Sequence, residues 1–245
     1  GIAHVPEKAN VQHYEVPAPF YDACLGRQKK FSSCFYPNLK ESLDEAEEVA
    51  FLQSADHAAL QDGQHVLELG CGWGSWSLWM ARRYPKSKIT GVSNSHSQRA
   101  YIMAQAAGRG LTNLEIVTCD MNQFDPRDAA SSRMPLHGFD RIVSVEMFEH
   151  MRNWEKLLGR VRSWLHDEGR FFAHVFAHRT HPYRFQDDKA EANNEAPRVR
   201  SHGNWMGEHF FSGGIMPSRD LFHQFSDVLE VEEDWWWDGR HYGLT

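Results

Sequence analysis

The sequence predicts an α/β fold built around a doubly wound, mostly parallel sheet. Three observations lead to this prediction. Short apolar runs alternate with helical patterns of 10–15 residues from residue 65 to residue 178, a glycine-rich turn follows the first run, and an acidic cluster follows the fourth. Strands that alternate with helices form parallel βαβ units, which close with a right-handed crossover.

Each element follows from its apolar spacing and its flanking residues. Strands are expected at 65–69, 88–92, 114–117, 141–145 and 170–176, because these runs are rich in Val, Ile, Leu and Phe. Helices are expected at 42–59, 75–84, 95–108 and 153–165, where apolar residues recur at helical spacing, and Pro85 ends the second of them.

The remaining segments predict less regular structure. An aromatic-rich stretch from Tyr14 to Tyr36 is expected to be irregular, and Phe210 to Pro217 with its Gly-Gly pair is expected to form a tight turn. We therefore expect an N-terminal cap and substrate lid over residues 1–60. A core over 61–245 is expected to follow, with a lid insertion at about 179–205 that is rich in charge, Asn, Pro and His.

Composition narrows the class of function. The chain has 245 residues, 41% of them hydrophobic and 24% charged, with a formal net charge of −7. This balance gives no support for a nucleic-acid partner or for a basic membrane-surface helix. The four cysteines form no CxxC pair, so neither a zinc site nor a disulfide framework is expected, and no metal is predicted. With no signal peptide or apolar span in view, a cytoplasmic location is expected.

The glycine-rich turn is the strongest candidate cofactor site. Gly70, Gly72 and Gly74 follow a strand and precede a helix, and Glu68 stands two positions before the first glycine. A carboxylate there suits a cationic ligand and would repel a dinucleotide pyrophosphate, whereas S-adenosylmethionine carries an ammonium and a sulfonium. This favours S-adenosylmethionine over NAD; a purely structural βα turn is the alternative.

The ends of the next strands offer further contacts for such a ligand. After the second strand come Ser93, Asn94 and Gln98, which are neutral where a dinucleotide enzyme places an acid. After the third come Asp120 and Met121, suited to the adenine amine and ring, although Asp120 could instead cap a turn.

A dense titratable cluster follows the fourth strand, directly after Val145. Glu146, Glu149 and His150 fall within five residues at the carboxyl end of a parallel strand, where open α/β sheets bind ligands. Carboxylates and an imidazole can take up the proton of an amine or stabilise its developing charge. The alternative is a helix N-terminus that is merely rich in acids.

Other side chains are candidates for the same crevice. They are His174, Tyr242 and the run Trp235-Trp236-Trp237. Three adjacent tryptophans are costly to expose, so at least one is expected to be buried or to line a pocket, with core packing expected for two. Trp236 could also hold a cation, and the exposed tryptophans leave a homodimer possible.

Taken together, these motifs resemble the cyclopropane-fatty-acid-synthase-like methyltransferases, and within them the N-methyltransferases of the coclaurine type. The resemblance runs from Gln12 to Tyr242. It is carried, in this order, by the segments at 31–36, 68–74, 91–95, 146–151, 210–218 and 238–242. It implies a Rossmann-like class I methyltransferase fold that uses S-adenosylmethionine, with a small cyclic or alkaloid-like amine as substrate.

The resemblance also implies roles for single residues. The loop glycines would hold the methionine moiety while Phe31 and Ser32 close over its carboxylate. Asn94 and Gln98 would face the ribose. Asp120, Met121 and Asn122 would face the adenine, and Glu146, Glu149 and His150 would shape the amine site, Glu149 and His150 being the stronger catalytic candidates.

A lipid-modifying branch of the same family is the alternative. There a Cys, a Glu, a His and a Tyr hold a bicarbonate that acts as base, and the matching positions are Ser33, Glu149, His174 and Tyr242. Because Ser33 replaces the Cys, and because a net charge of −7 would be repelled by anionic lipid, the amine reading is favoured and a membrane lipid is a partner only under this alternative. A non-enzymatic binding module would require the titratable cluster to be idle.

Overall fold

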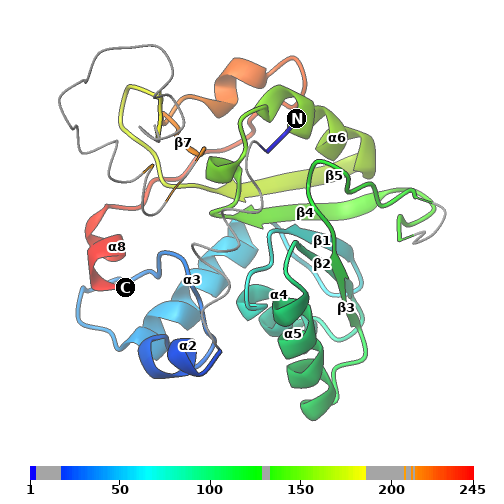
Figure 1. Cartoon of the computed structure of the whole chain (residues 1–245), viewed down its shortest axis with the longest axis vertical. Helices are drawn as coiled ribbons and strands as arrows, with labels where there is room; N and C mark the ends of the chain where they lie inside the picture. The colour runs from blue at the N-terminus through cyan, green and yellow to red at the C-terminus, as the bar shows by residue number, and fades with distance from the viewer. Residues whose placement is uncertain (4–17, 129–132, 186–206, 208–210, 212) are drawn as a thin grey trace, which may run out of the picture.

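A five-stranded parallel sheet forms the centre of the molecule. The structure is a computed structural model that describes residues 1–3, 18–128, 133–185, 207, 211 and 213–245 (Figure 1). Its strands are β1 (His65–Leu69), β2 (Lys88–Ser93), β3 (Leu114–Thr118), β4 (Phe139–Val145) and β5 (Leu165–His174), in the order β3-β2-β1-β4-β5. The predicted doubly wound sheet is confirmed, and the strand order reverses between β1 and β4.

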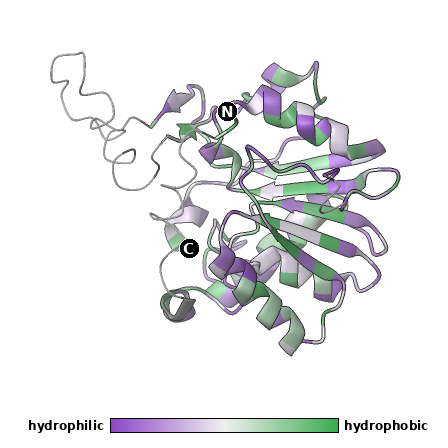
Figure 2. Cartoon of the chain, turned by 45° about the vertical axis from the view of Figure 1, so that its right-hand side comes forward, coloured by the Kyte–Doolittle hydropathy of each residue, from purple (hydrophilic) through white to green (hydrophobic). Residues whose placement is uncertain are grey.

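Helices cover both faces of the sheet. α3 (Leu43–His57), α4 (Ser75–Arg83) and α5 (His96–Gly108) lie on one side and α6 (Trp154–Trp164) on the other (Figure 1). Successive strand residues point to opposite faces, so Val66 belongs to the core with Trp76 and Trp79, and Leu67 to the core with Leu157. α6 carries both hydrophilic and hydrophobic residues along its length, as a helix with one buried face must (Figure 2).

Side-chain caps explain where two of the predicted helices begin. The Ser42 side chain accepts a hydrogen bond from the Glu45 backbone N–H, and the Glu45 carboxylate accepts one from the Ser42 backbone N–H, which is a capping box. Asn153 accepts one from the backbone of Lys156 at the start of α6.

Shorter elements surround the carboxyl end of the sheet. They are α2 (Ala18–Cys24), the 3₁₀-helix η2 (Phe148–His150), β6 (Tyr183–Arg184), β7 (Ile215–Met216), the 3₁₀-helix η3 (Phe222–Phe225) and α8 (Arg240–Leu244). α8 returns to the N-terminal part of the chain, where the Tyr36 hydroxyl donates to the Leu244 carbonyl at 2.9 Å (Figure 1).

Several sequence expectations need correction. The segment expected to be irregular contains α2, and the segment expected to be only a turn contains β7, which pairs antiparallel with β6. β5 starts at Leu165 rather than near residue 170 because Leu165 pairs with Phe139 of β4.

The tryptophan run also differs from expectation. Trp235 and Trp236 are 43% and 48% exposed, so core packing was wrong for these two. Trp235 stacks on His57 with ring centroids 3.9 Å apart, and the Arg219 guanidinium lies 5.3 Å from the Trp236 ring, which lowers the cost of their exposure.

The N-terminal cap and the lid fall partly outside the described residues. These residues leave out 4–17 of the cap and 186–205 of the lid, together with the resemblance carried by Gln12 to Val16 and by Phe210 and Ser212. No helix among the described residues is long and apolar enough to cross a membrane.

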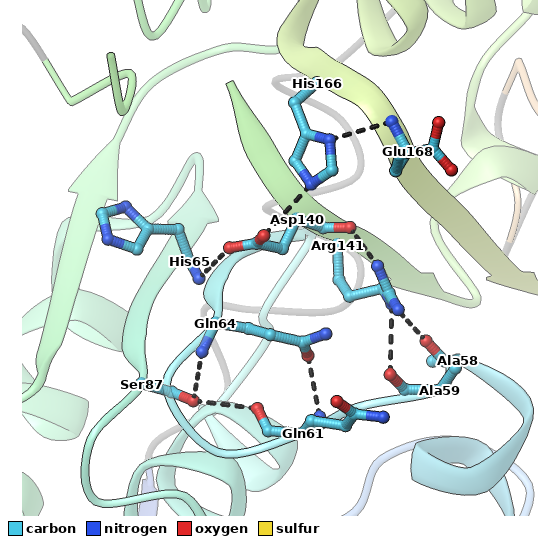
Figure 3. Close-up of polar contacts among 10 residues, drawn as sticks. All are labelled: Ala58, Ala59, Gln61, Gln64, His65, Ser87, Asp140, Arg141, His166 and Glu168. Carbon is cyan, nitrogen blue, oxygen red and sulfur yellow. Dashed lines mark hydrogen bonds and ion pairs between the residues drawn. The ribbon is translucent and has the colours of Figure 1, made fainter. Parts of the chain in front are cut away.

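A polar network closes the amino end of the sheet (Figure 3). Asp140 accepts the His65 backbone N–H at 2.7 Å and faces His166 Nε2 at 3.1 Å. Arg141 donates to the carbonyls of Ala58 and Ala59 at 2.9 and 3.2 Å, tying the end of α3 to β4. These bonds join three strand starts and one helix end.

Candidate active site

A single cavity lies at the carboxyl ends of β1, β2, β3 and β4. Thirteen of the predicted site residues line it: Phe31, Ser32, Glu68, Gly70, Gly72, Ser93, Asn94, Gln98, Asp120, Met121, Val145, Glu146 and His150. The cavity sits where the strand order reverses, which is where open α/β sheets bind their ligands. Gly74, Asn122, Glu149, His174 and Tyr242 are not among the lining residues.

The three loop glycines have different structural roles. All have positive φ: 79° at Gly70, 51° at Gly72 and 78° at Gly74. A Cβ at Gly74 would lie 2.5 Å from Ile102, so this glycine lets α4 and α5 pack closely. A Cβ at Gly72 would have no neighbour within 4 Å, so its bare backbone faces the open cavity.

Glu68 is a buried carboxyl in the wall of this cavity. Its Oε2 accepts a short hydrogen bond from the hydroxyl of Ser77 in α4, and the residue is 3% exposed. Burial raises the pKa of Glu68 to about 7, against the effect of Ser77. A cation in the cavity would restore its charge.

The first turn of α5, directly after β2, presents an unsatisfied amide. The Ser93 hydroxyl donates to Gln98 Oε1 at 2.6 Å and so fixes the side chain of Gln98, which is 1% exposed. Gln98 Nε2 has no hydrogen-bond partner among the described residues. A buried amide donor beside a cavity is suited to a ligand hydroxyl.

The adenine candidates after β3 separate into two groups. Asp120 and Met121 line the cavity, and the Asp120 carboxylate accepts from the Asn122 backbone at 2.9 Å. The Asn122 side chain turns to the N-terminus instead, where its Oδ1 accepts the backbone N–H groups of Ile2 and Ala3 at 2.5 and 3.1 Å.

Glu146, the residue directly after β4, has a strained backbone conformation. Its φ of 50° is in the left-handed region that residues with a Cβ rarely adopt. Oε1 accepts the Ser33 backbone N–H at 2.9 Å and Oε2 accepts the Tyr242 hydroxyl at 2.6 Å. Burial raises the pKa of Glu146, and the nearby Lys30 ammonium opposes that rise.

Glu149 lies fully buried on η2, close behind Glu146. Its Oε1 accepts the Phe176 backbone N–H at 2.8 Å, whereas Oε2 has no hydrogen-bond partner among the described residues. Burial, and then the charge of Glu146, hold the pKa of Glu149 well above its usual range. The next residue, His150, stacks on Phe211 with ring centroids 4.3 Å apart.

The positions matched to a bicarbonate site have other contacts. The Ser33 hydroxyl donates to the Cys34 carbonyl at 3.2 Å, and Tyr242 is bonded to Glu146. The His174 ring packs against Trp237 with centroids 4.7 Å apart, and desolvation lowers the pKa of His174 to about 3, which makes it a neutral imidazole at physiological pH.

Sequence reasoning missed several residues of the cavity wall. They include Lys29, Lys30, Phe51, Trp73, Trp76 and Met147. Among the described residues, no group of three or more His, Cys, Asp or Glu side chains could hold a metal ion.

Comparison with known proteins places these features in a family. The family model for mycolic acid cyclopropane synthetase matches residues 4–235. The chain is 33% identical to (S)-coclaurine N-methyltransferase of Thalictrum flavum subsp. glaucum, and the match covers 100% of this chain and 62% of that relative. It is 28% identical to cyclopropane-fatty-acyl-phospholipid synthase of Escherichia coli (strain K12), over 96% of this chain and 53% of that protein.

A solved structure extends the comparison to three dimensions. The crystal structure of coclaurine N-methyltransferase bound to N-methylheliamine and SAH matches with a TM-score of 0.85 and 31% identity, over 98% of this chain and 64% of that one. The fold is thus the Rossmann-like fold of class I methyltransferases, and the chain spans less than two thirds of the length of the relatives named here. By sequence and by fold, the chain belongs to the mycolic acid cyclopropane synthetase family.

Proposed function

We propose that the chain is the methyl-transfer core of an S-adenosylmethionine-dependent N-methyltransferase that acts on a small cyclic amine. The observation that carries the proposal is the meeting of two sites in one cavity: the glycine loop after β1 and the side chains of Glu146 and His150 after β4 line the same space. The N-methyltransferases among its relatives agree with this reading.

The cavity wall fits S-adenosylmethionine. The bare backbone at Gly72 allows close approach of the methionine moiety, and Glu68 offers a carboxylate to a cationic group. The unpaired Gln98 amide is a donor for a ribose hydroxyl, and Asp120 is an acceptor for the adenine amine. In the same proposal Phe31 and Ser32 close the site from the N-terminal side, and Asn122 acts by anchoring the chain at Ile2 and Ala3.

The acidic cluster then handles the amine. S-adenosylmethionine supplies a methyl group activated by a positively charged sulfur. Glu149, with one carboxylate oxygen unpartnered and a raised pKa, is matched to take up the amine proton, directly or with His150. Glu146 is held by two hydrogen bonds and stabilises the positive charge that develops on nitrogen.

A labelled methyl-transfer assay tests the proposal. The protein is incubated with methyl-labelled S-adenosylmethionine and, in parallel, with a panel of secondary and tertiary cyclic amines and with vesicles of unsaturated phospholipid. Label in an amine is the expected result. Label confined to the acyl chains, especially in a bicarbonate-dependent manner, would overturn the proposal.

A lipid-modifying reaction is the second candidate, favoured by the match to the Escherichia coli synthase. It would use the Ser33, Glu149, His174 and Tyr242 positions to hold bicarbonate. The commitment of the Tyr242 hydroxyl to Glu146 at 2.6 Å argues against it, because that hydroxyl would have to change partner to bind the anion.

A further inference from the structure

Lys30 is a buried cation in the wall of the cavity. Lys30 is 2% exposed. Its neighbour Lys29 instead forms an ion pair nearer the surface, with Asp22 at 3.0 Å, and the Asp22 side chain is 56% exposed. Lysine is almost never fully buried unless its charge is paired, because desolvating an ammonium is costly. The burial of Lys30 therefore indicates that its charge has a specific role in the cavity wall.

The lysine is clamped through both its backbone and its side chain. Glu47 of α3 accepts the backbone N–H groups of Gln28 and Lys30 at 2.7 and 2.9 Å. The Lys30 ammonium donates to the Ser32 hydroxyl at 2.6 Å and to the Ser33 carbonyl at 2.5 Å. The Lys30 ammonium thus fixes the segment Ser32–Ser33 by two hydrogen bonds.

That segment in turn holds Glu146. The Ser33 carbonyl accepts a hydrogen bond from the Lys30 ammonium, and the Ser33 backbone N–H donates to Glu146 Oε1 at 2.9 Å. The Lys30 ammonium also attracts the Glu146 carboxylate through space. The lysine therefore acts on Glu146 twice, through position and through charge.

We propose that Lys30 is a positioning residue for methyl transfer: its buried ammonium fixes the Ser32–Ser33 segment against Glu146 and places a positive charge near that carboxylate. The inference rests on the proposed function. It predicts that Lys30 affects the reaction through Glu146, and that S-adenosylhomocysteine binding is changed much less than turnover.

A double-mutant cycle tests the coupling. Lys30→Met should lower kcat about 10- to 100-fold, and the same change in a Glu146→Gln background should lower it less than about threefold further. Lys30→Arg should recover part of the loss. Lys40→Met, which removes an exposed lysine from the same N-terminal segment, should leave kcat unchanged. Equal losses from Lys30→Met in both backgrounds would overturn the proposal, as would a rise in the KM for S-adenosylmethionine with kcat unchanged.

A second readout does not depend on turnover. Carboxyl-carbon NMR follows the titration of Glu146, which is surrounded by Lys30, Ser33, Tyr242 and Glu149. Because Lys30 favours the charged carboxylate, its titration midpoint should rise in Lys30→Met and stay in place in Lys40→Met. An unchanged midpoint in a folded Lys30→Met protein overturns the inference even if amines are methylated. A raised midpoint without amine methylation places the failure in the proposed function instead.

Discussion

The two ends of the parallel sheet are built on opposite principles. At the amino end, Asp140 and Arg141 pair with backbone groups of two neighbouring segments, at His65 and at Ala58 (Figure 3). At the carboxyl end, Glu149 Oε2 and Gln98 Nε2 lie buried without partners among the described residues, and Glu146 has a strained backbone. The unsatisfied and strained groups at the carboxyl end lie where a ligand would be bound, whereas the hydrogen bonds at the amino end supply stability.

The largest expected effect is at Glu149. It tests whether the unsatisfied polar groups at the carboxyl end of the sheet take part in catalysis. Glu149→Gln keeps the shape of the side chain and removes its ability to take up a proton, so kcat should fall about 100-fold or more. Calorimetry with S-adenosylhomocysteine should show nearly unchanged affinity. Equal losses of turnover and affinity would count against Glu149 as a catalytic group.

A pair of loop glycines separates binding from packing within the carboxyl end. Gly72→Ala and Gly74→Ala share the cost of a positive φ, about 1 to 2 kcal/mol each. Gly74→Ala adds a contact of 2.5 Å with Ile102 and should lose about 1 to 3 kcal/mol more on chemical denaturation.

Gly72→Ala instead places a methyl group in the open cavity, so it should weaken binding of S-adenosylhomocysteine about tenfold or more, by steric exclusion of the ligand. Each variant is the control for the other. A similar affinity loss in both would mean that the loop acts only through its fold.

The amino end should respond in the reverse manner. Asp140→Ala removes the acceptor of the His65 N–H and the partner of His166, which should cost about 1 to 2 kcal/mol of unfolding free energy with kcat unchanged. Asp167→Ala, at an exposed neighbouring position, is the matched control and should be neutral. A fall in kcat at a temperature where Asp140→Ala is fully folded would contradict the separation of the two ends.

Much of the sheet could be predicted because its signals are local. The apolar runs of β1 to β4 and the caps of α3 and α6 lie within windows of a few residues, so sequence reasoning located them closely. The start of β5 was missed because residues 166–169 resemble a loop in composition and lie at a shift in register, between the pairing of Leu165 with Phe139 and that of Arg170 with Arg141.

The site could be predicted only as far as its motifs. The segments after β1, β3 and β4 were found because glycines and acids mark them, and the segment after β2 because neutral polar residues stand there. Their convergence follows from the parallel sheet. The burial of Lys30 depends on Glu47 and on Glu146, which is 116 positions away, so no local pattern reveals it. Whether the lining residues bind a cofactor stays a prediction.

The last expected effect concerns Glu68 and the pH dependence of stability. Its pKa is raised to about 7 in the folded chain, so between its unfolded value of about 4.3 and 7 the native state binds more protons than the unfolded state. Unfolding free energy contributed by this group is therefore full at low pH and is lost as pH rises through 7.

Glu68→Gln should remove that loss, so the variant should gain about 2 to 3 kcal/mol over the natural chain between pH 5 and pH 8 in urea denaturation. Glu146 and Glu149 also have raised pKa values and persist in both proteins, so the difference between them isolates Glu68. A parallel pH dependence in the two proteins would show that Glu68 is already charged in the folded chain. The hydrogen bond from the Ser77 hydroxyl would then be enough to stabilise the charged Glu68 carboxylate. At the carboxyl end of the sheet, Glu68 of β1 would thus be better satisfied than Glu149 of η2.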